Sequence, residues 1–235
     1  MSKNVVSIHQ PNYFPWMGYF YKMLHSDVFV YYDNIQIEQR SQQAFVNRTK
    51  IKTSHGELWL TCPVHVKESR LISDVELVRV FNWRTKHLKT IYYNYRKSRY
   101  FRQIYPKVER LIENPANLLC DYNIAIIEWI KSYLEIDTET VKASAYNGKT
   151  GCPTDRIINI LKQLDASTYI SGHGAKLYQD ESMFRAANIE LRYTNFQAKE
   201  YTQLYGEFVP KLSILDAIFN MGKDSISLLK NSDHC

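Results

Sequence analysis

Residues 5–32 read VVSIHQPNYFPWMGYFYKMLHSDVFVYY and combine two strand patterns with a helical pattern between them. The β-branched run at residues 5–8 ends just before Pro11, and the apolar run at residues 28–32 has the length of another buried strand. The helical pattern is carried by Met17, Phe20, Tyr21 and Leu24. A strand, a helix and a strand within so short a span predict a parallel, right-handed βαβ unit.

A parallel βαβ unit brings the residues that follow its two strands to one edge of the sheet. His9 and Gln10 follow the first strand, and Asp33 and Gln36 follow the second. Because open α/β sheets bind ligands at the carboxyl ends of their strands, we predict a site here with His9 and Asp33 as its catalytic residues. Histidine serves as a general base, and a carboxylate fixes its tautomer. The alternatives are that His9 caps the strand end and that Asp33 caps the following turn.

The rest of the chain predicts an α/β fold, in which an open sheet is flanked by helices and the middle segment is mostly helical. Strand patterns occur at residues 58–64, 71–77, 168–171 and 189–193, and helical patterns occur at 83–97, 101–114, 118–134, 153–164, 176–187, 213–219 and 225–229. No break in composition marks a domain boundary, so we expect one α/β domain over residues 1–235. The helical segment at about 83–135 is a candidate subdomain within it.

The chain carries a formal net charge of +6 at pH 7, which suits an anionic partner. Basic residues are densest between residues 79 and 107, where aromatic residues alternate with them as on some surfaces that bind nucleic acid. The alternative is an amphipathic helix with a solvated basic face, which fits the same residues. Its apolar stripe would consist of Trp83, Leu88, Ile91 and Tyr95.

The four cysteines and seven histidines have no spacing that fits a zinc site, and we expect no structural metal. The first residues lack the apolar core of a signal peptide, and no apolar run is long enough to span a bilayer. Together with the free thiols, these features predict a cytoplasmic protein. The chain has no GxSxG nucleophile elbow, whereas Cys152, at the start of a predicted helix, stays open as a nucleophile.

A second candidate loop follows the strand pattern at residues 168–171 and reads SGHGAK from Ser171 to Lys176. Its glycines would let backbone N–H groups approach a phosphate, with Lys176 adding positive charge. The spacing is neither that of a P-loop nor GxGxxG, and a tight turn from strand to helix needs glycine in any case. Arg48 is a further candidate anion-binding residue, for which an exposed basic loop is the alternative reading.

The longest motif in the chain, HQPNYFPWMGYF, runs from His9 to Phe20. It is followed by related positions at residues 26–30, Asp33, Gln36, 47–51, 59–64, 169–172, Tyr178, Phe184, Ile189, Tyr201, Gln203, 208–216, 219–220 and Gly222. These motifs, which span almost the whole chain, resemble those of the WbqC-like proteins. Cys62 and Cys152 depart from the family pattern, which argues against a cysteine nucleophile shared across the family.

The resemblance implies a role in the synthesis of O-antigen or other bacterial surface polysaccharide. The expected activity is an N-acyltransferase that attaches an amino acid, glycine in particular, to the amino group of a nucleotide-linked deoxyamino sugar. His9 or Asp33 would accept the proton of the amine. The motif positions assigned to substrate binding are Gln10, Tyr13, Gln36, Arg48, Lys176, Gln203 and Asp216.

Three alternatives stay open. The opening faintly resembles the nucleotidylyltransferases, which would allow adenylate formation from ATP with magnesium, although Tyr19 follows Gly18 where their HxGH motif has its second histidine. The basic region at residues 79–107 would suit a protein that binds nucleic acid such as tRNA. A non-catalytic partner in a polysaccharide assembly complex is the third. The amino-acid donor, whether free, tRNA-borne or carrier-borne, the cofactor and the oligomeric state are not determined by the sequence.

Overall fold

The computed structural model describes residues 4–38, 44–79, 82–146, 151–177 and 179–230. Its main sheet has five strands in the order β7-β2-β1-β8-β9. Their bounds are β1 Val5–His9, β2 Val28–Tyr31, β7 Glu139–Lys142, β8 Thr168–Gly172 and β9 Glu190–Thr194. All neighbouring pairs in this sheet are parallel, which confirms the predicted α/β fold and its N-terminal βαβ unit.

The strand order reverses direction between β1 and β8. From β1 the chain moves outward to β2 and then to β7, before it returns to β8 on the other side of β1 and continues to β9. In doubly wound sheets such a reversal is the point where ligands bind, outside the carboxyl ends of the two strands. Here those ends are His9 of β1 and Gly172 of β8.

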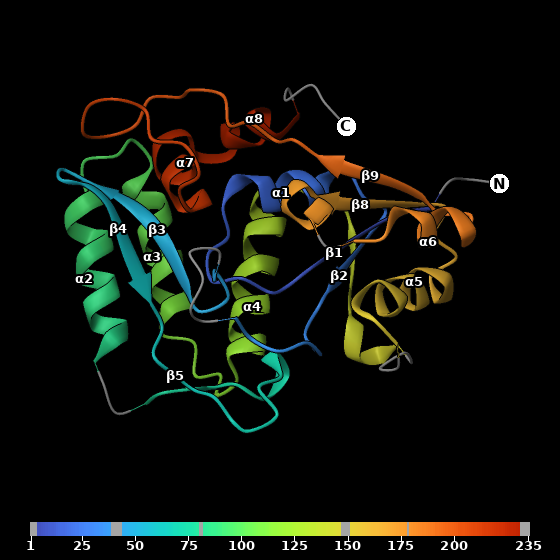
Figure 1. Ribbon diagram of the computed structural model, residues 1–235. Helices are drawn as coiled ribbons and strands as arrows, with labels where there is room; N and C mark the ends of the chain where they lie inside the picture. The colour runs from blue at the N-terminus through green and yellow to red at the C-terminus, as the bar shows by residue number, and fades with distance from the viewer. Residues whose placement is uncertain (1–3, 39–43, 80–81, 147–150, 178, 231–235) are drawn as a thin grey trace.

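The alternation of side chains along the strands divides the core between the two faces of the sheet. On one face, Phe29 and Tyr31 pack with helices α1 (Met17–Leu24) and α4 (Leu119–Tyr133). On the other face, Val28 and Val30 pack with α5 (Pro153–Gln163) and α6 (Glu181–Ala186). Figure 1 shows the sheet between these two groups of helices.

A long insertion between β2 and β7 carries most of the remaining elements (Figure 1). They are the hairpin of β3 (Arg48–Thr53) and β4 (Gly56–Thr61), the short pair β5 (Val64–His65) and β6 (Glu76–Leu77), the 3-10 helix η1 (Ile72–Asp74), and helices α2 (Trp83–Tyr95) and α3 (Phe101–Ile112), before α4. Helix α7 (Ile214–Met221), which lies near the C-terminal end of the described chain, packs against this insertion. Its flanking backbone bonds to β3, with Ser213 N–H donating to the Lys50 carbonyl at 2.8 Å.

The remaining short elements are the 3-10 helices η2 (Ala143–Ala145), η3 (His173–Leu177) and η4 (Gly222–Ile226), and helix α8 (Ser227–Lys230). η2 follows β7, and η3 follows β8, so both lie at the same edge of the sheet as His9. The helix predicted at residues 176–187 is instead two pieces, η3 and α6. Tyr178, one of the motif positions, lies outside the described residues.

Two strands differ from the sequence-based expectation. β3 has the sequence RTKIKT, in which the lysines conceal the alternation of buried Thr49 and Ile51, and it pairs with β4. The strand pattern at residues 71–77 is instead the 3-10 helix η1 followed by the two-residue strand β6. β7 is a four-residue edge strand with no fully buried position, so its apolar signal is weak.

Candidate functional site

His9 ends β1 with its side chain on the α1 face of the sheet. Its ring meets the ring of Tyr19 edge-on, with centroids 4.8 Å apart, and its Nδ1 lies 3.1 Å from the carbonyl oxygen of Gln10. Burial of the ring and the nearby positive charge of Lys22 lower the pKa of His9 to about 3. His9 is therefore a neutral imidazole at neutral pH, able to accept a hydrogen bond or a proton.

Lys22 is a part of this site that sequence reasoning missed. It lies on the inner face of α1, is only 3% exposed, and donates from Nζ to the carbonyl oxygen of Ile8 at 2.8 Å. Among the residues that the structure describes, no carboxylate forms an ion pair with it. Burial lowers the pKa of Lys22 to about 7. The available signal was a lone lysine inside a helix whose residues from Met17 to Met23 are otherwise uncharged.

Asp33 lies at the same edge of the sheet, as the βαβ pattern predicts, but its side chain bonds to Ser144, which follows β7. The side chain is buried, and its two carboxylate oxygens accept from Ser144 N–H at 2.9 Å and from the Ser144 hydroxyl at 2.6 Å. In the described part of the chain no contact joins Asp33 to His9. These bonds give Asp33 a clear structural role, which ties the end of β2 to η2.

The loop after β8 leaves open space at the sheet edge. Neither Gly172 nor Gly174 has a positive φ, and a Cβ atom built on either glycine meets nothing within 4 Å. The turn into η3 therefore does not require glycine for its conformation or for close packing. The fold therefore gives no reason for glycine at these two positions. Glycine there would let a ligand approach the backbone closely. Lys176 in η3 is exposed, with its Nζ 6.0 Å from the centre of the Tyr193 ring.

Strand pairing makes the two loops neighbours. β1 pairs with β8 with Ser7 opposite Ile170, so two residues further on His9 and Gly172 end adjacent strands. Paired strands lie about 4.8 Å apart. The structure therefore brings together the two loops that the sequence offered as separate candidates, and half-buried Gln10 extends the first of them.

Two predicted substrate-binding residues lie in a different place, in a polar network beside α7. Asp216 is buried and accepts from the hydroxyls of Tyr95 and Tyr201, each at 2.9 Å. Gln203 donates to the Tyr201 hydroxyl at 3.1 Å and accepts from Lys52 Nζ at 3.1 Å. Burial raises the pKa of Asp216. This network joins the C-terminal segment to β3 and α2, which gives both residues a structural role.

The other three predicted substrate-binding residues are spread over the insertion and its surroundings. Tyr13 is fully buried, with its hydroxyl 3.0 Å from Nδ1 of His87. Arg48 donates from Nε to the Ala44 carbonyl at 2.8 Å, and its guanidinium lies 4.3 Å from the centre of the Trp59 ring. Gln36 is exposed and pairs with Leu71 in an isolated β-bridge. Their assignment to substrate stays a prediction.

Among the residues that the structure describes, no helix is long and apolar enough to cross a membrane. Within the same residues, no three or more His, Cys, Asp or Glu side chains are grouped so that they could hold a metal ion. The thiols of Cys62 and Cys120 are buried, and burial raises the pKa of both, whereas Cys152 is exposed. Neither buried thiol is suited to be a nucleophile.

Comparisons with known proteins agree over nearly the whole chain. The model of a family described as the WbqC-like protein family matches residues 10–228. An uncharacterized protein of Mycobacterium tuberculosis is 33% identical over 229 residues, which cover 96% of this chain and 97% of that protein. No solved structure matches the chain. The family match includes both Gln10 and the loop after β8.

Proposed function

The chain belongs to the WbqC-like protein family, and we propose that it is an N-acyltransferase that joins an amino acid, glycine in particular, to the amino group of a nucleotide-linked deoxyamino sugar. The product would enter the synthesis of O-antigen or another surface polysaccharide. One observation carries the proposal. The His9–Gln10 turn and the Gly172–Gly174 loop end adjacent strands at the point where the strand order reverses.

The loop after β8 supplies the features that a sugar nucleotide needs. Its backbone is approachable at Gly172 and Gly174, because the space that a side chain would fill is open. Backbone N–H groups at such a turn bind phosphate oxygens, and Lys176 adds an exposed positive charge beside them. We assign the diphosphate to this loop, which directs the amino sugar toward the end of β1.

His9 is then the group that receives the proton of the amine. Attack of a neutral amine on an acyl carbon forms a tetrahedral intermediate whose ammonium is more acidic than the protonated free amine. A base must be neutral and held in place to take up this proton, and it works best when its pKa lies near the working pH. His9 is neutral, with a pKa of about 3, and its ring is held between Tyr19 and the Gln10 carbonyl. The negative charge of a diphosphate bound nearby would raise this pKa toward the working range. Asp33 remains the alternative acceptor, at the end of the neighbouring strand.

The acyl donor must be activated before it reaches this site. With a tRNA-borne or carrier-borne amino acid, the amine displaces the carrier and the ester or thioester bond breaks. With a free amino acid, ATP and magnesium would first form an adenylate with release of pyrophosphate, and the amine would then displace AMP. Pyrophosphate release in the presence of ATP and glycine would identify this second route, which corresponds to the nucleotidylyltransferase resemblance.

The test is to detect the product. Purified protein is incubated with a panel of nucleotide-linked amino sugars, glycine, ATP and magnesium, with and without charged tRNA, and the sugars are analysed by mass spectrometry. We expect one sugar to gain one glycyl group. His9→Gln should lower turnover by roughly two to four orders of magnitude, while the matched control His55→Gln, on an exposed turn of the β3–β4 hairpin, should not. No glycylated sugar with any donor would refute the proposed activity.

A further inference from the structure

The surface of α2 and α3 carries a positive charge that the fold does not neutralise. Residues 84–113 contain nine basic and two acidic residues. In the described part of the chain, none of the nine basic side chains forms an ion pair. Helix α2 buries Trp83, Leu88, Ile91 and Tyr95 as the sequence pattern predicts, and it exposes Lys86 and Lys89 to solvent. Its third basic residue, Arg84, is half-buried and donates to the Ile112 carbonyl.

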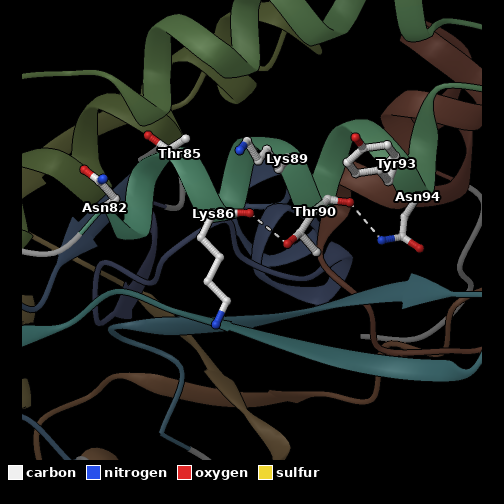
Figure 2. Close-up of a pocket in the computed structure, with 7 residues that line it drawn as sticks. All are labelled: Asn82, Thr85, Lys86, Lys89, Thr90, Tyr93 and Asn94. Atoms are coloured by element: carbon white, nitrogen blue, oxygen red, sulfur yellow. Dashed lines mark hydrogen bonds between the residues drawn. The ribbon is translucent and has the colours of Figure 1, made fainter.

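An open groove of about 550 Å³ runs along this exposed side of α2 (Figure 2). Lys86 and Lys89 line it one helical turn apart, and Tyr93 lies one further turn along. Tyr93 is 63% exposed and its neighbour Tyr92 is 40% exposed, which places two large aromatic rings beside the lysines. Figure 2 shows Lys86, Lys89 and Tyr93 on successive turns of α2, with Lys86 extended away from the helix.

The groove also has unused polar groups. The side chains of Asn82 and Thr85 form no hydrogen bond with any residue that the structure describes, although both line the groove. By contrast, Thr90 and Asn94 are occupied, since each donates to a backbone carbonyl one turn earlier on α2. The groove thus combines free positive charges, an exposed aromatic ring, and an amide and a hydroxyl available for recognition.

We propose that this groove binds single-stranded RNA. Lysines bind phosphates, and exposed tyrosines stack on unpaired bases, which a duplex keeps inside its helix. The free amide and hydroxyl of Asn82 and Thr85 suit the 2′-hydroxyl, which both donates and accepts hydrogen bonds. The exposed rings are tyrosines with polar tips and the surface is hollowed, which suits a strand better than a flat membrane. The groove lies on α2, apart from the sheet edge, and the inference goes beyond the proposed function without depending on it.

The binding test uses a fluorescently labelled, unstructured RNA 12-mer, as a probe, and measures fluorescence anisotropy from about 50 to about 200 mM salt. We expect binding that weakens as salt is added. The double variant Lys86→Glu/Lys89→Glu should bind about tenfold more weakly or worse, because two phosphate contacts become repulsive. The matched control Lys162→Glu/Lys199→Glu changes the net charge equally at exposed positions outside the groove, and it should bind like the parent protein.

Stacking is tested separately at one position. Tyr93→Leu should lose about tenfold in affinity, whereas Tyr93→Phe, which keeps the ring, should not. Thermal unfolding checks that each variant is folded, as expected for exposed positions. The proposal is overturned by absence of binding at low salt, by equal loss in the two lysine variants, or by unchanged binding of Tyr93→Leu. Equal binding of the matching DNA strand or RNA duplex, or binding of anionic vesicles in place of RNA, overturns the choice of partner.

Discussion

At the scale of single residues, the site at the end of β1 is controlled by two basic groups that lie close together without an acidic partner. His9 and Lys22 both have lowered pKa values, of about 3 and about 7, because burial disfavours their charged forms. The charge of Lys22 lowers the pKa of His9 further. Lys22 therefore adds to the effect of burial on His9, and it also holds the end of β1 through the Ile8 carbonyl.

This coupling predicts the effect of Lys22→Met. The substitution keeps a long side chain in the same space and removes the positive charge, so the pKa of His9 should rise above about 3. Burial of the ring, which is the larger cause of the lowered pKa, should still hold it below the ordinary value of 6.5. The measurement is an NMR titration of the imidazole, with the exposed Lys162→Met as the control. An unchanged His9 titration in folded Lys22→Met would show that the two groups are not coupled.

The burial of His87 predicts part of the loss of folding stability at low pH. His87 is buried against Tyr13, and burial lowers its pKa to about 4, below the value near 6.5 in the unfolded chain. The unfolded state therefore binds a proton that the folded state does not, and stability falls as the pH drops from about 6.5 to about 4. His87→Gln should flatten this dependence by on the order of 1–3 kcal/mol, measured by urea unfolding across that range. An equally steep loss in the variant would contradict this account.

Residue types at the sheet edge could be predicted from the sequence, but their partners could not. His9 and Asp33 were placed by the βαβ pattern alone, because two strands and a short helix leave one geometry. Lys22 appeared to be an ordinary polar residue of α1, and the bonds of Asp33 to Ser144 depend on β7, more than 100 residues away. Contacts at that separation leave no local signal.

At the scale of elements, two glycines differ in whether the fold requires them: Gly222, which follows α7, and Gly172, which ends β8. Gly222 has a φ of +62°, and a Cβ there would lie 2.7 Å from the Tyr100 ring, whereas Gly172 has neither constraint. The fold therefore explains Gly222 and does not explain Gly172.

Alanine at the two glycines should separate stability from binding. Gly222→Ala should lose at least about 1–2 kcal/mol of stability, from backbone strain and the clash with Tyr100. Gly172→Ala should change stability by less than about 1 kcal/mol, because its Cβ meets open space, yet it should weaken the binding of a nucleotide-linked amino sugar. Thermal unfolding and calorimetric titration measure the two effects. Normal sugar-nucleotide binding by Gly172→Ala would remove the phosphate role from this loop.

Helices and strands whose apolar residues recur at a regular spacing could be predicted from the sequence. Strands whose buried face includes charged or half-exposed residues could not. Helix α2 follows its Trp83–Tyr95 stripe, and β1 and β2 follow their apolar runs. β3 was missed because Lys52, which a sequence pattern counts as exposed, is buried in the structure. Its ammonium bonds to Gln203, and this contact allows the lysine to lie in the interior. β7 was missed because none of its four residues is fully buried, so the strand carries no clear apolar pattern.

At the scale of the whole molecule, one apolar cluster links the sheet to the insertion. It contains Phe29 and Tyr31 of β2 together with residues of α1, α2, α3, α4 and α7. The two loops of the proposed site belong to strands that are neighbours in space but about 160 residues apart in the chain. The sequence offered them as independent candidates, because it does not encode strand order in any local pattern.

The shared cluster predicts one cooperative unfolding transition, so the segment at about 83–135 is expected not to unfold as a separate subdomain. In a variant with Trp16→Phe and Trp59→Phe, the two remaining tryptophans, Trp83 and Trp129, report on this segment by fluorescence. Far-UV circular dichroism reports on the whole chain. The two denaturation curves should coincide. A fluorescence transition at a clearly different denaturant concentration would instead establish two independent units.

In the proposed function, substrate binds where the strand order reverses, between the ends of β1 and β8. Hydrogen–deuterium exchange with and without a nucleotide-linked amino sugar would locate this binding site. We predict slower exchange in peptides that cover residues 9–16 and 171–177, with no change in the β3–β4 hairpin. Saturating ligand that protects only other segments, or that leaves both of these loops unchanged, would contradict the account.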